Sequence, residues 1–96
     1  MRYDAIAINN QDNVATALRV LQKGETVLVG VGDGTMAVAL VEDVEFGHKI
    51  AVHDIATGDD IIKYGEVIGR ATKKIPGGAH AHVHNIESLR GRGDLE

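Results

Sequence analysis

The sequence predicts a mostly β domain built from short strands, with one short helix near the amino terminus over about residues 12–22. Twelve of the 96 residues are glycine, and they separate short runs rich in valine and isoleucine. Such runs between turn residues are typical of strands. Aromatic residues make up only 3% of the chain, so the core must be built from small aliphatic side chains. Short strands of this kind favour a compact β unit that leaves few exposed edges.

The amino-terminal part of the chain predicts one strand and then the helix. Apolar residues alternate loosely over residues 3–8, which indicates a strand. Residues 10–13 form a polar turn rich in helix-capping side chains. Apolar residues then recur at three- and four-residue spacing, at Val14, Ala17, Leu18 and Leu21. This spacing predicts an amphipathic helix that ends just before Gly24.

From residue 26 onward the sequence predicts strands separated by turns that contain glycine. The expected strands cover residues 26–29, 35–41, 49–53, 61–64, 67–72 and 80–85. We find no internal repeat and no linker. We therefore expect a single domain over residues 1–88 and a flexible tail over residues 89–96. Leu95-Glu96, at the end of that tail, matches what expression vectors leave before an affinity tag.

Composition excludes several classes of function. A net charge of -4 and the scarcity of aromatic side chains argue against a nucleic-acid partner. The absence of cysteine excludes disulfides and thiolate metal sites. No apolar run approaches the roughly 20 residues that a membrane helix needs. The first residues lack a signal-peptide pattern, so we expect a cytoplasmic protein. So small a core makes a homo-oligomer plausible.

The densest group of chemically active residues lies over residues 80–85, where histidine alternates with other residues. Alternate side chains of a strand share one face, so His80, His82 and His84 would line one surface while Ala81 and Val83 face the core. A row of imidazoles is typical of transition-metal sites. His80 and His84 would lie about 13 Å apart on a straight strand, so only neighbouring histidines could share a metal ion. A polar strand face, or a substrate-contacting surface without metal, are the alternatives.

Two turns carry further candidate residues. The sequence Gly47-His48-Lys49 presents a titratable ring and a cation after a glycine corner, and Lys49 could hold a carboxylate. Lys63 and Tyr64 are adjacent, so on a strand they point to opposite faces. Residue types alone favour an ordinary solvent-facing turn at each of these two motifs. The glycines of residues 30–34 indicate a hairpin, because the lysine and the helix of a phosphate-binding loop are missing.

Taken in order, these motifs resemble a known family. The motifs occupy residues 12–15, 47–49, 58–65, 68–69 and 82–85. Their order and spacing resemble the small amino-terminal domain of the altronate/galactarate dehydratase family, and they are similar to the small subunit of sulfolactate sulfo-lyase. The resemblance runs from about residue 9 to residue 85, which is most of the chain.

The resemblance implies a fold and a function. The fold would be a SAF-type β-clip. In this family the domain precedes, or pairs with, a much larger catalytic part that carries divalent-metal chemistry, usually associated with iron(II). The chain would then be an accessory domain or small subunit of a sugar-acid dehydratase, a carbon–oxygen lyase, and it would be inactive alone. Its partners would be that larger part, fused or separate, and an anionic sugar acid.

The resemblance also assigns candidate roles to residues on the matching motifs. The catalytic candidates are His48, Lys49, His82 and His84. The substrate-binding candidates are Lys49, Lys63, Tyr64 and Asn85. The candidate metal ligands are His82 and His84. These types suit the chemistry, because dehydration of a sugar acid develops enediolate-like charge that cations stabilise, and because a general acid must protonate the departing hydroxyl.

Two other functions remain open. The chain could be the small subunit of a sulfolactate sulfo-lyase, in which sulfite leaves instead of water. It could instead be a non-catalytic carbohydrate- or protein-binding β module, in which the histidine row would be the binding surface.

Overall fold

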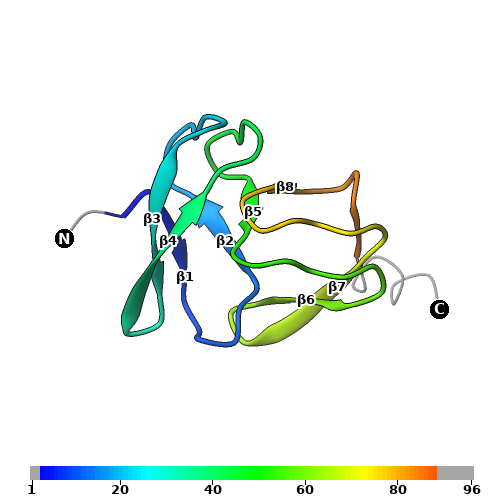
Figure 1. Ribbon diagram of the computed structural model, residues 1–96. Helices are drawn as coiled ribbons and strands as arrows, with labels where there is room; N and C mark the ends of the chain where they lie inside the picture. The colour runs from blue at the N-terminus through cyan, green and yellow to red at the C-terminus, as the bar shows by residue number, and fades with distance from the viewer. Residues whose placement is uncertain (1–2, 89–96) are drawn as a thin grey trace.

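A computed structural model describes residues 3–88 of the chain. Within these residues the fold consists of nine strands (Figure 1). They are β1 (Ala5–Ala7), β2 (Val14–Ala17), β3 (Thr26–Val31), β4 (Gly34–Ala39), β5 (Lys49–Ala51), β6 (Asp60–Lys63), β7 (Glu66–Ala71), β8 (His80–Ala81) and β9 (Ile86–Ser88). The prediction of a mostly β fold is confirmed. The predicted tail over residues 89–96 lies outside the described residues.

The strands form two sheets. The larger sheet has the order β4-β3-β1-β2-β5-β8, in which β1 and β3 are parallel and all other neighbours are antiparallel. The smaller sheet has the order β6-β7-β9 and is antiparallel throughout. Figure 1 shows the smaller sheet on the side of the molecule away from the β3–β4 hairpin. Within residues 3–88 there is no helix long and apolar enough to cross a membrane.

The predicted helix over about residues 12–22 is wrong, because this segment contains the strand β2 instead. Val14 packs into one buried cluster, whereas Ala15 and Ala17 pack into the other. This alternation has the period of a strand rather than that of a helix. Leu18, which the helix would have buried, is 45% exposed. The position of β2 between β1 and β5, with apolar residues on both sides, overrides the helical spacing.

Two buried aliphatic clusters make up the core. The first lies under the larger sheet and includes Leu21, Val27, Val29, Val44 and Ile50. The second contains Val14, Ile55, Ile61, Ile75 and four alanines. The aliphatic core expected from the composition is therefore present. No buried side-chain nitrogen or oxygen atom among the described residues lacks a hydrogen-bond partner.

The structure contains a corner that recurs four times along the chain. Four β-turns, over residues 22–25, 45–48, 56–59 and 76–79, each have a hydrogen bond from the last backbone N–H to the first carbonyl, at 3.0 or 3.1 Å. The third residue of each turn is a glycine with a φ angle between +85° and +93°. This is a type II turn, which requires the positive φ that glycine supplies.

Each of these turns follows a buried aliphatic residue and leads into a strand. The aliphatic residues pair as two isolated bridges, Leu21 with Val44 and Ile55 with Ile75. The strands that follow are β3, β5, β6 and β8. The turn before β5 ends at His48, and the turn before β8 ends directly before His80.

The predicted strand over residues 80–85 is only partly present. β8 ends at Ala81, and residues 82–85 form a turn that leads into β9. Val83, which the strand would have directed into the core, is 82% exposed. The turn places the histidines differently from the straight strand that the sequence predicts.

Candidate functional site

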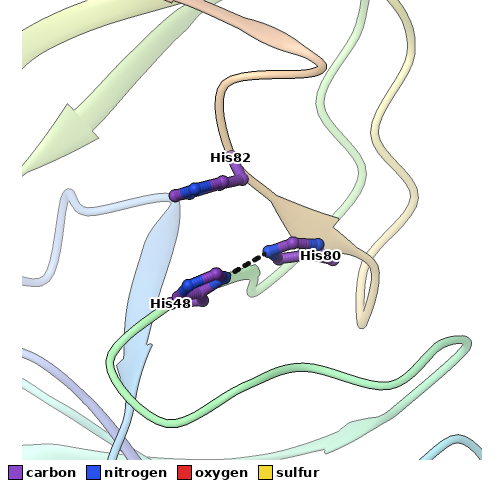
Figure 2. Close-up of side chains that lie close together, drawn as sticks. All are labelled: His48, His80 and His82. Carbon is purple, nitrogen blue, oxygen red and sulfur yellow. Dashed lines mark hydrogen bonds between the residues drawn. The ribbon is translucent and has the colours of Figure 1, made fainter.

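Three histidine rings stack against one another at the junction of β5 and β8 (Figure 2). The ring centroids of His48 and His82 are 4.2 Å apart, those of His48 and His80 are 5.0 Å apart, and those of His80 and His82 are 5.3 Å apart. The ring planes are within 16° of parallel. His48 Nδ1 and His80 Nε2 are 2.9 Å apart and share one proton in a hydrogen bond. We call these three residues the histidine cluster.

Strand register explains why the cluster forms. β5 and β8 are antiparallel, with Lys49 opposite Ala81 and Ile50 opposite His80. Continuing this register by one residue places His48 opposite His82, which is the pair with the shortest ring separation. Directly opposed residues on one face of a sheet lie close enough for their side chains to touch. His80 and His82 lie two residues apart, so they also share that face.

The side chain of Asn85 fixes the turn that follows β8. Its Oδ1 accepts a hydrogen bond from the His82 backbone N–H at 2.8 Å, and its Nδ2 donates one to the His80 carbonyl at 2.9 Å. Asn85 is only 5% exposed. The turn brings the ring of His84 to 5.1 Å from that of His80. The expected separation of about 13 Å, which assumed a straight strand, is therefore wrong.

A carboxylate contact fixes the start of β8. The His80 backbone N–H donates a hydrogen bond to Glu42 Oε1 at 2.7 Å. The backbone of His80 is thus held on both sides, by Glu42 at its N–H and by Asn85 at its carbonyl. A ring whose backbone is held in this way has fewer positions to explore, which favours a preorganised site.

Lys49 and Lys63 bring positive charge to the neighbourhood of the cluster. Lys49 directly follows His48 on β5, and Lys63 ends β6. Burial lowers the pKa of Lys49, and the charge of Lys63 lowers it further. The ion pairs among residues 3–88 involve only Arg19, with Asp4 and Glu25, so neither lysine has a carboxylate partner there. Two nearby unpaired cations favour the binding of an anion.

Tyr64 occupies a conformation that is unusual for its residue type. It joins β6 to β7 with a φ of +57, and Gly65 follows with a φ of +74. The buried carboxylate of Asp12 accepts a hydrogen bond from the Gly65 N–H at 2.8 Å, which holds this turn. The tyrosine ring is exposed, with Lys63 Nζ 4.9 Å from its centre. An exposed aromatic residue in the left-handed region is a candidate for contact with a ligand or partner.

Burial and neighbouring charges lower the pKa values of two rings of the cluster, which favours their neutral form. Burial lowers the pKa of His80, and the neighbouring histidines His84, His48 and His82 lower it further, against an opposing effect of Glu42. Burial also lowers the pKa of His82, together with the charges of His48, Lys49 and His84. A neutral imidazole has one nitrogen with a free lone pair, so these rings can accept a proton or bind a metal ion.

The cluster has the donor set of a transition-metal site. One nitrogen from each of His48, His80 and His82 can be chosen so that all three lie within 4.8 Å of one another. Imidazole nitrogens suit iron, zinc, copper and nickel ions, whereas magnesium and calcium prefer oxygen ligands. The residues present therefore fit a divalent transition metal by their chemistry.

The structure brings together most of the residues that the sequence singled out. His48, Lys49, His82 and His84 lie around one strand junction, and Lys63 is close enough for its charge to act on Lys49. Asn85 is present too, but both ends of its amide already bind backbone groups. The roles that the resemblance assigns leave out His80, although its ring belongs to the cluster. Its alternation with His82 and His84 is the sequence signal that points to it.

The chain matches known proteins over most of its length. The family model for the altronate/galactarate dehydratase SAF domain matches residues 3–89. Altronate dehydratase from Bacillus subtilis (strain 168) is 44% identical over 84 residues, which cover 86% of this chain. Altronate dehydratase from Escherichia coli (strain K12) is 46% identical over 83 residues, which also cover 86% of this chain. Each match spans only 16% of the dehydratase.

A second kind of relative is much smaller. The alpha subunit of (2R)-sulfolactate sulfo-lyase from Chromohalobacter salexigens is 38% identical over 58 residues, which cover 60% of this chain and 62% of that subunit. Domains of this type therefore occur both as a small part of a long chain and as most of a short subunit.

Proposed function

The chain belongs to the altronate/galactarate dehydratase SAF domain family, and we propose that it is the accessory domain or small subunit of a sugar-acid dehydratase. It would contribute histidine and lysine side chains to the active site of a larger metal-dependent partner. The observation that carries this proposal is the gathering of histidine rings near the junction of β5 and β8, together with two lysines that have no carboxylate partner among residues 3–88. The small share of the dehydratases that the chain spans supports a role that needs a larger partner.

The two lysines suit the binding of a sugar-acid carboxylate. The charge of Lys63 acts on Lys49, and neither lysine has a carboxylate partner among residues 3–88. An anion bound between the two lysines would be attracted to both, and it would also reduce the repulsion between them. Tyr64 completes the proposed substrate-binding set with an exposed phenol next to Lys63, whereas Asn85, whose amide binds backbone groups at both ends, holds the turn that carries the histidines.

The histidines suit the proton transfers of a dehydration. A sugar acid loses water when a base removes the proton next to the carboxylate and the neighbouring hydroxyl leaves with a proton from an acid. The product is an enol that becomes a 2-keto acid. His48 precedes Lys49 in the chain, the charge of Lys49 acts on His82, and His84 lies by His80. A neutral ring can accept one proton while a protonated ring can supply the other. Lys49 would stabilise the negative charge that develops on the carboxylate.

The partner is expected to hold most of the metal site. A divalent metal, which we expect to be iron(II), would stabilise the enediolate-like charge when it is bound. His82 and His84 are candidate ligands from this chain. The domain would bring these groups to the partner by closing over its active site.

A reconstitution assay tests this function. The chain is mixed with the large dehydratase polypeptide of the same source and iron(II) without oxygen, and formation of 2-keto acid is followed with a panel of hexonates and hexarates. We expect activity that needs both polypeptides and falls at least tenfold with Lys49→Ala. Lys74→Ala, which alters an exposed lysine of the turn region before β8, is the matched control. Full activity of the large polypeptide alone would refute the proposal and favour a non-catalytic binding module.

A small subunit of a sulfolactate sulfo-lyase is the second candidate. It is favoured by the match to sulfo-lyase alpha subunits, which covers 62% and 72% of two of them. The same cations would hold the carboxylate of sulfolactate, and sulfite would leave instead of hydroxide. Release of sulfite from sulfolactate in the reconstitution assay, without turnover of any hexonate, would establish this alternative.

A further inference from the structure

We propose that His48, His80 and His82 form a complete protein ligand set for one divalent transition-metal ion, so that this domain binds a metal ion of its own without the larger partner. This inference goes beyond the proposed function, which expects the metal to be held mainly by the partner. It also differs from the ligand pair His82 and His84, which the sequence indicates.

The distances of the histidine cluster suit coordination of a single ion. Zinc–nitrogen bonds of about 2.0–2.1 Å in a tetrahedral site require ligand nitrogens roughly 3.3 Å apart. His48 Nδ1 and His80 Nε2 are 2.9 Å apart, and the whole set of donor nitrogens fits within 4.8 Å. The nitrogen–nitrogen spacing of roughly 3.3 Å that the ion requires lies between these two distances. The proton shared by His48 Nδ1 and His80 Nε2 lies between the two nitrogens that would both bind the metal ion.

The rings need only a local change to bind the ion. Lone pairs of imidazole lie in the ring plane, and the planes of the cluster are within 16° of parallel, so the lone pairs do not yet meet at one point. Rotation about the side-chain torsions would direct them to a common centre. His48, His80 and His82 are all half-buried, so their outer edges have room for this rotation.

The backbone around the cluster is held firmly. Pairing of β5 with β8 fixes His48 opposite His82, and Asn85 and Glu42 fix the backbone of residues 80–82. Ligand positions that are set before the metal arrives lower the entropy lost on binding. The cluster thus has the preorganised backbone that distinguishes a metal site from a chance group of surface histidines.

The donor set selects the class of ion. All three donors are nitrogen atoms, and no carboxylate belongs to the group. Late first-row divalent ions such as cobalt, nickel and zinc bind such sites, whereas magnesium and calcium need oxygen ligands. Three neutral ligands leave the charge of the ion uncompensated, and Lys49 adds positive charge nearby. The free coordination positions therefore suit an anionic oxygen ligand.

Cobalt(II) titration of the isolated chain, without any affinity tag, tests the inference. Cobalt(II) in a low-symmetry nitrogen site gives visible absorption bands that report coordination directly. We expect one ion per chain, and at least a tenfold loss of affinity in each of His48→Ala, His80→Ala and His82→Ala. His53→Ala is the matched control, because His53 is exposed and bonds only to the neighbouring Asp54 carbonyl. Magnesium in excess should not displace the cobalt ion.

Two results would overturn the inference. The first is the absence of cobalt bands in a chain that circular dichroism shows to be folded. The second is binding that survives all three alanine variants, or that is lost with His84→Ala while it survives in His48→Ala. Where an alanine variant does not fold, the asparagine variant at the same position gives the result. The test needs no partner and no turnover, so its failure would leave the proposed dehydratase role standing, and failure of reconstitution would leave the metal site standing.

Discussion

Replacement of Asn85 by alanine should destabilise the domain and loosen the histidine cluster at the same time. The variant removes an acceptor for the His82 N–H and a donor for the His80 carbonyl, at 2.8 and 2.9 Å. Each hydrogen bond of this kind contributes about 1–1.5 kcal/mol net. The free energy of unfolding should therefore fall by about 2–3 kcal/mol. A change of 1 kcal/mol shifts Tm by about 4–8 °C in a domain of this size, so Tm should fall by about 10–20 °C.

The assay is thermal and urea unfolding followed by far-ultraviolet circular dichroism, because the chain contains no tryptophan. Asn10→Ala is the control: Asn10 is exposed, and no side-chain hydrogen bond of Asn10 is present among residues 3–88, so the free energy of unfolding should change by no more than about 0.5 kcal/mol. Asn85→Asp should give an intermediate loss, because the acceptor oxygen remains while the donor is lost. A Tm for Asn85→Ala within about 2 °C of that of Asn10→Ala would refute the reasoning, since shifts of that size lie within the scatter of surface substitutions.

Three further predictions concern backbone conformation and charge. Gly78→Ala should abolish folding, because φ is +86 and the added Cβ would clash with the backbone carbonyl of Ala39. Gly47 has nearly the same φ of +85, but no atom lies near its added Cβ, so Gly47→Ala should lower the free energy of unfolding, measured in urea, by only about 1 kcal/mol. Because the pKa values of His80 and His82 are lowered in the folded chain, Tm should be constant above the usual histidine pKa of about 6.5 and fall as the pH drops below it; a flat profile would contradict this. Tyr64→Asn should raise the free energy of unfolding by about 0.5–1 kcal/mol, because asparagine tolerates the φ of +57 better, while reconstituted activity should fall; unchanged activity would remove Tyr64 from the site.

The strands β3 to β7 could be predicted because their signal is local, whereas β8 is shorter than predicted and β9 lies outside the predicted strands. Runs rich in β-branched residues lie between turns that contain glycine, and each of these five strands overlaps such a run. The segment around β2 could not be predicted in this way. Its alanines have no strand preference of their own, and only the packing of Val14 and Ala15 on opposite sides of the sheet decides its conformation.

The recurring corners cannot be recognised from the sequence, because the sequence that they share is minimal. An aliphatic residue followed three positions later by glycine is all that the four turns share, and that pattern is frequent in any β protein. What defines the repeat is the positive φ of the glycine and the hydrogen bond across the turn. Both are properties of the backbone that a single sequence does not display.

The candidate site shows the same division between local and non-local information. Alternation of histidines over residues 80–84 indicated that His80 and His82 share a face, and the structure agrees. The position of His48 depends instead on the register between β5 and β8, which is set by the corners over residues 45–48 and 76–79. A slip of one residue in that register would move His48 to the opposite face of the sheet and leave only two rings together. The geometry of the histidine cluster is therefore encoded as much in two glycine turns as in the histidines, and an insertion in either turn should abolish metal binding while all three ligands remain in the sequence.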